Sequence, residues 1–359
     1  MKKNLNVVLV SPFPPPAGGI ALWAVRYLKY CPNFGINCSH VNTAYEGQVV
    51  FGDSKKIGYF KQFKRAKNIW KNVTNKIREN NAEILHICIP ATFKSILREL
   101  ITVKKGNKLG VKTIIHFRST VSQSASSFLG KVLLKKICKI VDGIIVLNNY
   151  SYEYVSKYCE KEKISIIPNF IDGEEIVEQF NVKEKIKTIS YVGGVVEEKG
   201  CKLLIEFAKN HQDIEFNLIG SSSEKIRDSA SELNNVRLIN EQPKEIVKEY
   251  LKNSDVFMFL SKYKMEGFSN ALLEAMATGL PCIATKWASN ELQLGDYSDK
   301  VTINIDSLEE LESAFKFLLS QENRNSVSKY NLERSKLFET NNIMSEYKGF
   351  YEKIMNYGK

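Results

Sequence analysis

Two glutamates flank the start of an expected helix in residues 265–285, MEGFSNALLEAMATGLPCIAT. Ser269 or Asn270 is a good N-cap for this helix, so Glu266 lies just before it and Glu274 about one turn inside it. A helix N-terminus binds phosphate, and carboxylates on each side accept hydrogen bonds from hydroxyl groups. The pattern predicts a socket for a nucleotide sugar, although acidic residues also occur in first helical turns for dipole reasons alone.

The elements that must position these residues alternate along the whole chain. Short β-branched runs, many of them continuously apolar, are separated by longer helical patterns, which is typical of βαβ units and parallel sheets. The fold class is therefore α/β, with two doubly wound, Rossmann-like domains facing across a cleft. The expected strands are Asn6–Val10, Ile36–Val41, Ile84–Ile89, Thr113–Phe117, Gly143–Leu147 and Ile164–Ile167, then Thr188–Val192, Glu215–Ile219, Val236–Ile239, Val256–Leu260, Pro281–Ala284 and Val301–Ile305.

Chain length and one charged stretch set the expected domain borders. A chain of 359 residues exceeds what one hydrophobic core usually serves. The turn PNFID and a charged stretch separate the two series of strands. We expect a first domain over 1–170, a linker over 171–187, a second domain over 188–340, and a C-terminal helix over 341–359 that can dock on either domain, crossing back to the first.

Composition excludes several classes of protein. The chain is 43% hydrophobic and 25% charged, so it can bury a full core and is not disordered. Its seven cysteines are scattered without a C-x-x-C pair, which favours neither a disulfide framework nor a zinc site. The apolar run at the N-terminus is too short for a signal peptide, and no run approaches the roughly 20 residues of a spanning helix. We expect a cytoplasmic protein, or one that lies on a membrane without crossing it.

Positive charge is concentrated in the first half of the chain. Residues 1–180 carry 27 Lys and Arg against 13 Asp and Glu, whereas residues 181–359 carry 24 against 27. The stretch 55–78, KKIGYFKQFKRAKNIWKNVTNKIR, interleaves aromatic residues with lysines, as in helices that lie on an anionic bilayer. A solvated helix face with its apolar side in the core fits the same pattern. No RNA- or DNA-binding signature accompanies the charge, so we expect no nucleic-acid partner.

The segment around the two glutamates resembles the mark of glycosyltransferase family 4, E-G-F-x-x-x-x-L-E-A-M-A-x-G-x-P. The family comprises retaining enzymes of the GT-B fold. The resemblance implies that Glu274 holds the ribose of a nucleotide-sugar donor and that Glu266 contacts donor-sugar hydroxyls beside the reaction centre. The other donor-binding residues that it implies here are Gly267, Phe268, Ser269, Asn270 and Ala271.

Three segments of the first half are similar to further motifs of the family. The Gly18-Gly19 pair in PFPPPAGG is similar to its N-terminal glycine loop, where the absence of Cβ lets backbone amides approach a phosphate or an acceptor. TIIHFR resembles the strand that ends in a histidine lining the family's cleft, which implies that His116 contacts the donor sugar or the reacting groups. IPNFID resembles the turn that ends the first domain and gives Asn169 an architectural role. An ordinary loop and a structural histidine are the alternatives for the first two.

The segment YVGGVVEEKG resembles the opening of the family's second domain, G-R-x-x-x-E-K-G, with one departure. Lys199 occupies the lysine position, but Gly194 stands where the arginine is usual. The resemblance implies that the arginine and the lysine together bind the donor diphosphate. Without the arginine, this chain lacks one bidentate hydrogen-bond donor to the diphosphate. The cations that could compensate are Lys202, Lys262, Lys264 and Arg118. Glu291, in KWASNELQL, resembles a glutamate that braces the nucleotide side of the cleft.

We expect a reaction without cofactor or metal ion. No D-x-D triplet occurs, and no group of His, Cys, Asp and Glu shows metal-ligand spacing in the sequence. The helix dipole and Lys199 would then stabilise the leaving diphosphate. Retention is expected through a front-face displacement in which the leaving phosphate accepts the proton of the acceptor.

Together the resemblance and the charge predict a hexosyl- or N-acetylhexosaminyltransferase with Glu266, His116 and Lys199 as catalytic residues. A UDP-sugar is favoured over a GDP-sugar as donor, and the acceptor is a saccharide hydroxyl, lipid-linked, on the cytoplasmic face of a bacterial inner membrane. The opening PFPPPAGGIALW resembles enzymes of bacterial O-antigen, capsule or exopolysaccharide synthesis. The alternative is a catalytically weakened sugar-nucleotide-binding or scaffold protein of the same fold, which the missing arginine motivates; an epimerase is disfavoured.

Overall fold

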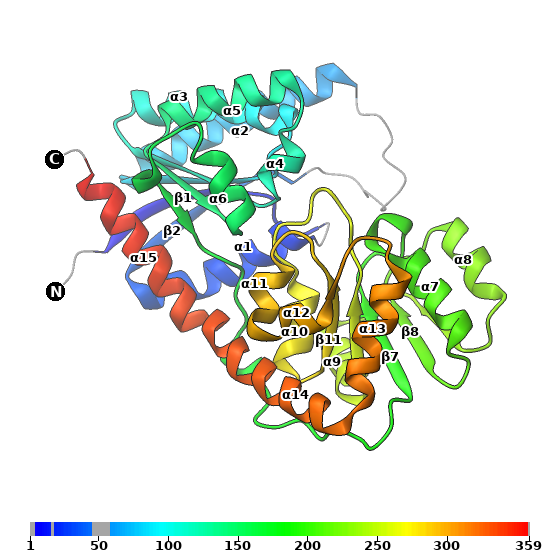
Figure 1. The fold of residues 1–359 in the computed structure, drawn as a ribbon. Helices are drawn as coiled ribbons and strands as arrows, with labels where there is room; N and C mark the ends of the chain where they lie inside the picture. Colours follow the sequence, from blue (N-terminus) through cyan, green and yellow to red (C-terminus); the bar gives the residue numbers. More distant parts are fainter. Residues whose placement is uncertain (1–3, 16–17, 45–57, 358–359) are drawn as a thin grey trace. The chain divides into compact units, whose positions relative to one another are not determined.

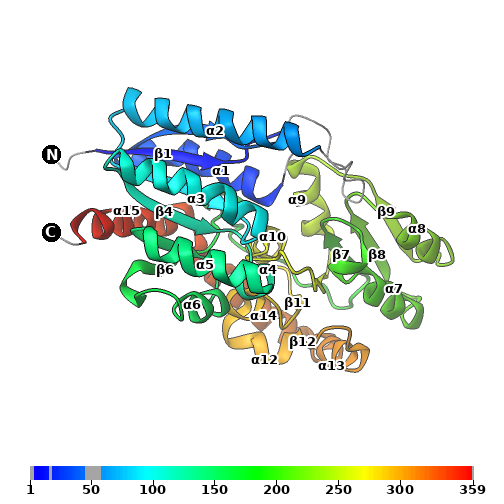
Figure 2. The same ribbon diagram turned by 90° about the horizontal axis from the view of Figure 1, so that it is seen from above.

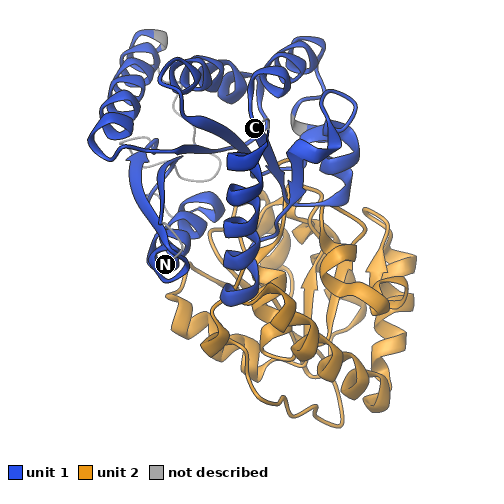
Figure 3. Ribbon diagram, turned by 90° about the vertical axis from the view of Figure 1, so that its left-hand side faces the viewer, with its two compact units in different colours: residues 1–169, 340–359 blue, residues 170–339 orange. Residues whose placement is uncertain are grey.

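The protein consists of two compact units, seen in a computed structural model that describes residues 4–15, 18–44 and 58–357. Unit 1 is formed by residues 1–169 with 340–359, and unit 2 by residues 170–339 (Figure 3). The C-terminal helix therefore belongs to unit 1. Two parts of the sequence motifs lie outside the described residues: 16–17 of the proline-rich segment and 55–57 of the basic stretch.

Unit 1 is built on a six-stranded, fully parallel sheet. The strand order is β2-β1-β3-β4-β5-β6, so the chain reverses direction across the sheet after β2. Such a reversal brings the loops after neighbouring strands to one edge, where α/β folds bind ligands. The strands are β1 (Leu5–Ser11), β2 (Ile36–Asn42), β3 (Ile84–Ile89), β4 (Lys112–Phe117), β5 (Gly143–Val146) and β6 (Ile164–Ile166).

Helices cover both faces of this sheet, as the alternation of side chains along β3 illustrates. Leu85, Ile87 and Ile89 pack into a core with residues of α2, α3 and α5, whereas His86 points to the face covered by α1 and α15. Figures 1 and 2 show α2, α3 and α5 side by side on their face of the sheet. The helices of unit 1 are α1 (Gly19–Tyr30), α2 (Tyr59–Glu79), α3 (Phe93–Lys108), α4 (Val121–Ser124), α5 (Phe128–Ile140), α6 (Asn149–Val155) and α15 (Thr340–Asn356).

Unit 2 repeats the architecture with a second parallel sheet in the order β12-β11-β10-β7-β8-β9. Its strands are β7 (Thr188–Val192), β8 (Glu215–Ile219), β9 (Val236–Ile239), β10 (Val256–Phe259), β11 (Cys282–Thr285) and β12 (Thr302–Ile303). Its helices are α7 (Cys201–Asn210), α8 (Glu224–Ser231), α9 (Lys244–Asn253), α10 (Asn270–Ala277), α11 (Asn290–Leu294), α12 (Ser298–Val301), α13 (Leu308–Leu319) and α14 (Gln321–Ser335).

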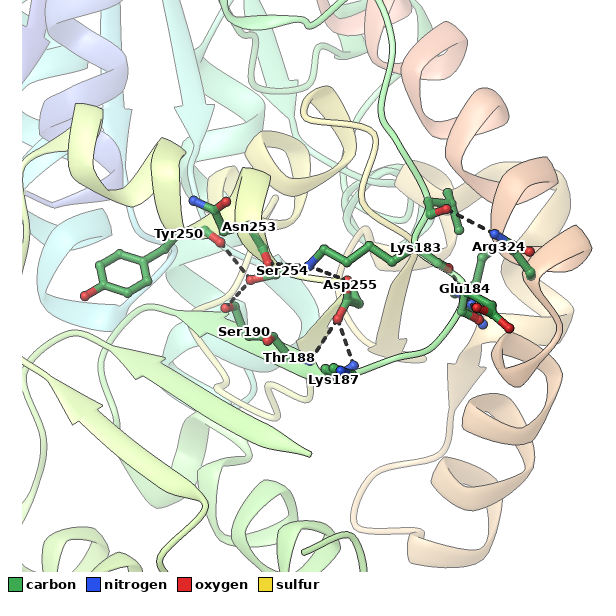
Figure 4. Close-up of polar contacts among 12 residues, drawn as sticks. Lys183, Glu184, Lys187, Thr188, Ser190, Tyr250, Asn253, Ser254, Asp255 and Arg324 are labelled. Carbon is green, nitrogen blue, oxygen red and sulfur yellow. Dashed lines mark hydrogen bonds and ion pairs between the residues drawn. The ribbon is translucent and has the colours of Figure 1, made fainter. Parts of the chain in front are cut away.

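The segment 171–187 is part of unit 2 rather than a free linker. The buried guanidinium of Arg324 donates to the carbonyls of Lys183 and Glu184 at 2.9 and 2.8 Å (Figure 4). Asp255 accepts hydrogen bonds from the backbone N–H groups of Lys187 and Thr188 at 2.8 and 2.9 Å. These buried, charge-assisted bonds fix the entry into β7. The backbone of the segment, rather than the charged side chains that suggested a linker, makes these four bonds to unit 2.

The expected strands and the α/β fold class are confirmed, with strand ends shifted by at most a few residues. The largest difference is β12, which keeps only Thr302 and Ile303 of the expected 301–305. No helix in the described ranges is long and apolar enough to cross a membrane.

Candidate active site

Two side chains fix the backbone at the N-terminus of α10. Ser269 is the N-cap, and its hydroxyl accepts a hydrogen bond from the N–H of Leu272 at 3.1 Å. Gln293 on α11 brackets the backbone of Ser269, since its amide oxygen accepts from the Ser269 N–H at 3.2 Å and its amide nitrogen donates to the Ser269 carbonyl at 2.9 Å. The predicted N-cap is thus in place, and the structure adds Gln293, which no sequence motif singled out.

Lys199 and Glu266 form an ion pair immediately before α10. The Lys199 Nζ lies 2.5 Å from a carboxylate oxygen of Glu266, and the hydroxyl of Ser261 donates to the same oxygen at 3.2 Å. The ammonium also lies 4.6 Å from the ring centre of Tyr263. Only 14% and 12% of the two charged side chains is exposed, so little water screens the pair. The two catalytic candidates of unit 2 are therefore brought together and oriented by Ser261 and Tyr263.

Gly200 explains why Lys199 can reach this position. Its backbone is left-handed, with φ of 80°, and an added Cβ would lie 1.9 Å from the carbonyl oxygen of Leu260. Only glycine fits such a close approach of two backbones. The turn before α7 is in this way pressed against the end of β10, from which Ser261 and Glu266 follow. A further backbone bond, from Lys262 N–H to the Glu198 carbonyl at 3.0 Å, holds the same two loops together.

Gly194 leaves the arginine position of the motif without a side chain. Its carbonyl accepts hydrogen bonds from the Tyr191 hydroxyl at 2.9 Å and from the Val196 N–H at 3.0 Å, and these two bonds order the loop. Among the compensating cations of unit 2, Lys262 pairs with Asp306 at 2.6 Å, while Lys202 and Lys264 are exposed. Arg118 belongs to unit 1.

Glu274 lines a hollow of about 280 Å³ within unit 2. Most of its wall is charged, and the rest is apolar or hydroxylic: Glu174, Glu175, Lys244, Glu245 and Lys248, with Ile171, Val247, Leu251 and Thr278. The ribose contact of Glu274 stays a prediction. Glu291, the other acid predicted on the nucleotide side, lies in the first turn of α11 and is partly buried.

Gly18 and Gly19 begin α1 with open space around them. Gly18 is the N-cap in an extended conformation, and a Cβ built on either residue would meet no atom within 4 Å. The chain itself therefore does not require glycine at these positions. Close approach by a ligand remains the prediction for both.

His116 is fully buried in unit 1, and both of its ring nitrogens are engaged. Its Nε2 lies 3.0 Å from the Arg118 guanidinium, and its Nδ1 lies 3.1 Å from His86 Nε2. Since Arg118 can only donate, Nε2 of His116 accepts and Nδ1–H donates to His86. The Nδ1–H of His86 then donates to Tyr351 at 2.5 Å. The other end of the Arg118 guanidinium donates to Asn169 at 2.5 Å. The contact of His116 with the donor sugar or the reacting groups stays a prediction.

One group of His and Cys side chains comes together only in the folded chain. One ligand atom each from His86, Cys88 and His116 lies within 4.8 Å of the others. The spacing was invisible in the sequence because β3 and β4 carry these residues and the parallel register pairs Cys88 with His116. The donor set does not fit a metal ion while Arg118 binds His116, because the imidazole nitrogen facing the group carries a proton.

Burial keeps both histidines neutral. It lowers the pKa of His86 from its ordinary value of 6.5 to about 3, and it lowers the pKa of His116 well below 6.5; the Arg118 charge adds to both effects. Burial likewise raises the pKa of the Cys88 thiol to about 12. These groups therefore form an uncharged, hydrogen-bonded layer beneath a single cation.

Known proteins resemble both units. The model of "Glycosyl transferases group 1" matches residues 172–334, and that of "Glycosyltransferase Family 4" matches residues 17–175. An Escherichia coli UDP-Gal:α-D-GlcNAc-diphosphoundecaprenol α-1,3-galactosyltransferase is 28% identical over 235 residues, which are 57% of this chain and 59% of that protein. The chain thus matches less than two thirds of the length of this relative.

Two solved structures share the fold over nearly the whole chain. Sucrose-phosphate synthase from Thermosynechococcus elongatus has a TM-score of 0.77 at 15% identity and covers 98% of this chain and 99% of its own. Anabaena HepE in complex with UDP-glucose has a TM-score of 0.75 at 12% identity, with 98% and 99% covered. With two family models that together span residues 17–334, the chain belongs to glycosyltransferase family 4 and is a glycosyltransferase of the GT-B fold.

Proposed function

We propose that this glycosyltransferase moves a sugar, with retention and without a metal ion, from a UDP-sugar to a saccharide hydroxyl on a lipid-linked acceptor. The observation that carries the proposal is the Lys199–Glu266 ion pair at the N-terminus of α10, with Glu274 on the same helix. A donor diphosphate at this helix end would meet the Lys199 ammonium and the positive end of the α10 dipole. Glu266 would turn to the sugar hydroxyls and Glu274 to the ribose.

The chemistry assigned to these residues is electrostatic. The leaving diphosphate gains charge as the glycosidic bond breaks, and Lys199 with the helix dipole stabilises it there. Glu266 is held by Lys199 and Ser261 as a hydrogen-bond acceptor, which suits orientation of the sugar rather than attack on it. We therefore propose a front-face displacement. Detection of a covalent glycosyl-enzyme by mass spectrometry would rule this route out.

A lipid-linked acceptor is supported by a relative and by a surface. The Escherichia coli relative carries a diphosphoundecaprenol-linked acceptor in its name. In unit 1, the helices α2, α3 and α5 contain 16 Lys and Arg against two acids, Glu79 and the buried Glu99. Large apolar side chains are exposed on the same three helices: Phe60, Phe63, Phe93, Leu97, Ile101, Phe128, Leu129 and Val132. This surface, the basic apolar face, would dock unit 1 on the anionic cytoplasmic leaflet of a bacterial inner membrane.

The deciding experiment is a transfer assay with a matched donor set. Purified protein is incubated with UDP-, GDP- and ADP-sugars and a short prenyl-diphosphate saccharide, with and without EDTA, and products are identified by mass spectrometry and by the anomeric coupling in NMR. We expect one UDP-sugar to be transferred with retention in EDTA. Inversion, dependence on added divalent ions or preference for a GDP-sugar would each contradict that part of the proposal. If no donor is even hydrolysed while UDP binds, the protein is instead a sugar-nucleotide-binding scaffold, the alternative that Gly194 motivates.

A further inference from the structure

Arg118 is a buried cation without an acidic partner. It follows β4 at the carboxyl edge of the unit 1 sheet and is 6% exposed. Its guanidinium binds His116 Nε2 at 3.0 Å and Asn169 Oδ1 at 2.5 Å, and it lies 4.5 Å from the ring centre of Trp23. All three partners are uncharged, and in the described part of the chain no carboxylate forms an ion pair with it. A desolvated charge of this kind is costly unless an opposite charge completes the site.

The layer beneath Arg118 holds it in place and cannot neutralise it. His116 donates onward to His86, and His86 to Tyr351, so each acceptor in this layer is already used. Tyr351 in turn lies 2.7 Å from the hydroxyl of Tyr27. Because an arginine never gives up its proton in a protein, the positive charge stays on Arg118, at the end of this series of hydrogen-bonded side chains.

Two further donors beside Arg118 are incompletely satisfied. The indole N–H of Trp23 and the hydroxyl of Tyr347 are both buried, and neither makes a hydrogen bond of normal geometry among the described residues. Their rings lie 5.8 Å apart, and Trp23 and Arg118 reach the Tyr347 hydroxyl only through weak polar contacts. Buried donors are satisfied in nearly all folded proteins, so two poorly satisfied donors beside a cation without an acidic partner point to a missing acceptor with negative charge.

We propose that Arg118, Trp23 and Tyr347 form an anion site in unit 1 that takes a phosphoryl group of a substrate. The proposal rests on the function proposed above and deepens it. A guanidinium presents two parallel N–H groups to phosphate oxygens, and the indole and phenol supply further donors to the same group. Trp23 belongs to α1, the helix that Gly18 and Gly19 begin, so the open glycine backbone and this site are on one helix. The phosphoryl group comes either from the nucleotide donor or from a prenyl diphosphate acceptor.

Binding is measured without turnover by isothermal calorimetry with three probes: inorganic pyrophosphate, UDP, and farnesyl diphosphate with farnesol as its uncharged control. The variants are Arg118→Lys and Tyr347→Phe, the second of which removes a single oxygen and keeps the ring that packs against α1. Arg324→Lys is the matched control, because that buried guanidinium is already bound by the carbonyls of Leu318, Leu319, Lys183 and Glu184.

We expect Arg118→Lys to weaken binding of at least one phosphoryl probe about ten-fold or more, and Tyr347→Phe about three-fold, since hydrogen bonds to charged groups are the strong ones. Arg324→Lys should leave the affinities unchanged. Loss with UDP alone assigns the site to the donor, and loss with farnesyl diphosphate alone assigns it to the acceptor. In the second case, farnesol should not compete.

The proposal is overturned if neither Arg118→Lys nor Tyr347→Phe changes the affinity for any probe by more than two-fold while both remain folded by circular dichroism. Should Arg118→Lys not fold, Tyr347→Phe decides alone. A failure of the proposed function is distinguishable, because it would leave Arg118-dependent binding of phosphoryl probes in a protein that transfers no sugar.

Discussion

At the scale of single residues, the Lys199–Glu266 pair bears on how the site can work without the arginine that the motif usually has. With Gly194 in the arginine position, Lys199 is the one motif cation that unit 2 brings to the start of α10 in its described part. Glu266 and Tyr263 both contact its ammonium and hold it beside the start of α10.

Lys199→Ala should lower kcat/KM about a hundred-fold, because it removes the positive charge and a charged hydrogen bond that would stabilise the leaving diphosphate. The loss should exceed that in relatives that keep the arginine. Steady-state kinetics on the preferred donor measures it, and Lys225→Ala is the control, since its pair with Glu197 is exposed. Activity within three-fold of the unmodified protein after Lys199→Ala would refute the assignment.

Substitution of three glycines by alanine tests whether each glycine is needed for a ligand or for the fold. Gly18→Ala and Gly19→Ala meet open space, so the melting temperature should stay within about two degrees while turnover falls. Gly200→Ala combines a left-handed backbone with a clash against the Leu260 carbonyl, so it should destabilise unit 2 by about 2 kcal/mol or more. Differential scanning fluorimetry and the transfer assay separate the two outcomes. Full activity in both N-terminal variants would leave the glycine loop without a ligand role.

The neutral histidines give a pH dependence with a defined sign. Because the pKa of His86 is 6.5 ordinarily and about 3 when folded, the unfolded state binds more protons between these values. Its contribution to stability is complete above pH 6.5 and is lost as the pH falls. From pH 7.5 to 5.5 the titration of His86 should lower the free energy of unfolding by about 1 kcal/mol. Urea titration of a Trp287→Phe background, whose remaining tryptophans belong to unit 1, measures this; in a further His86→Gln variant the drop should be about 1 kcal/mol smaller. An identical drop would show that His86 does not titrate on unfolding.

At the scale of elements, α5 combines strongly exposed apolar side chains with positive charge on the basic apolar face. Phe128 and Leu129 are 80% and 60% exposed at its start, and its four lysines have no acid beside them in the helix. Exposed aromatic and aliphatic side chains at a helix start insert into the headgroup region, and the lysines add an electrostatic attraction.

Replacing Phe128 and Leu129 with serine should weaken binding to vesicles of anionic lipid about ten-fold or more, because both side chains lose their apolar burial. Vesicle sedimentation at low and high salt is the measurement. The control is Leu319→Ser, which removes a leucine that is 56% exposed on α13 of unit 2. Equal binding of both variants, or no effect of salt on the unmodified protein, would count against membrane docking by this face.

The elements were more predictable than the contacts between them. Every strand followed from a short apolar run, and the cap of α10 followed from Ser269, since these signals are local. Ser261, Tyr263 and Gln293 carry no local signal, and they reach the site only because separate loops follow parallel strands to one edge. The His86–His116 contact likewise depends on the register between β3 and β4, which periodicity does not encode.

At the scale of the whole molecule, the two units differ in how the chain builds them. Unit 2 is one continuous segment, 170–339, whereas unit 1 needs residues 340–359 to complete it. Tyr347 and Tyr351 of α15 are fully buried against Trp23, Tyr27 and His86. Unit 1 without α15 would expose this aromatic cluster together with the Arg118 layer.

A chain ended after Glu339 should therefore keep a folded unit 2 and lose the cooperative unfolding of unit 1. Fluorimetry should show a remaining transition that UDP raises, because a ligand that binds only the folded state stabilises it. Limited proteolysis should degrade residues before 170 and spare those after. Retention of both transitions would mean that α15 contributes little to unit 1.

The return of α15 also sets the order in which the protein can mature on the ribosome. The sheet of unit 1 is synthesised first, yet the helix that covers one of its faces emerges only after all of unit 2. During that interval α1 alone can cover the sheet face bearing His86, Cys88 and His116, so part of this face stays exposed while unit 2 can already fold. Nascent unit 1 is thus the part of the chain that chaperones would be expected to hold, and synonymous changes that slow translation between residues 170 and 339 should lower the yield of soluble protein.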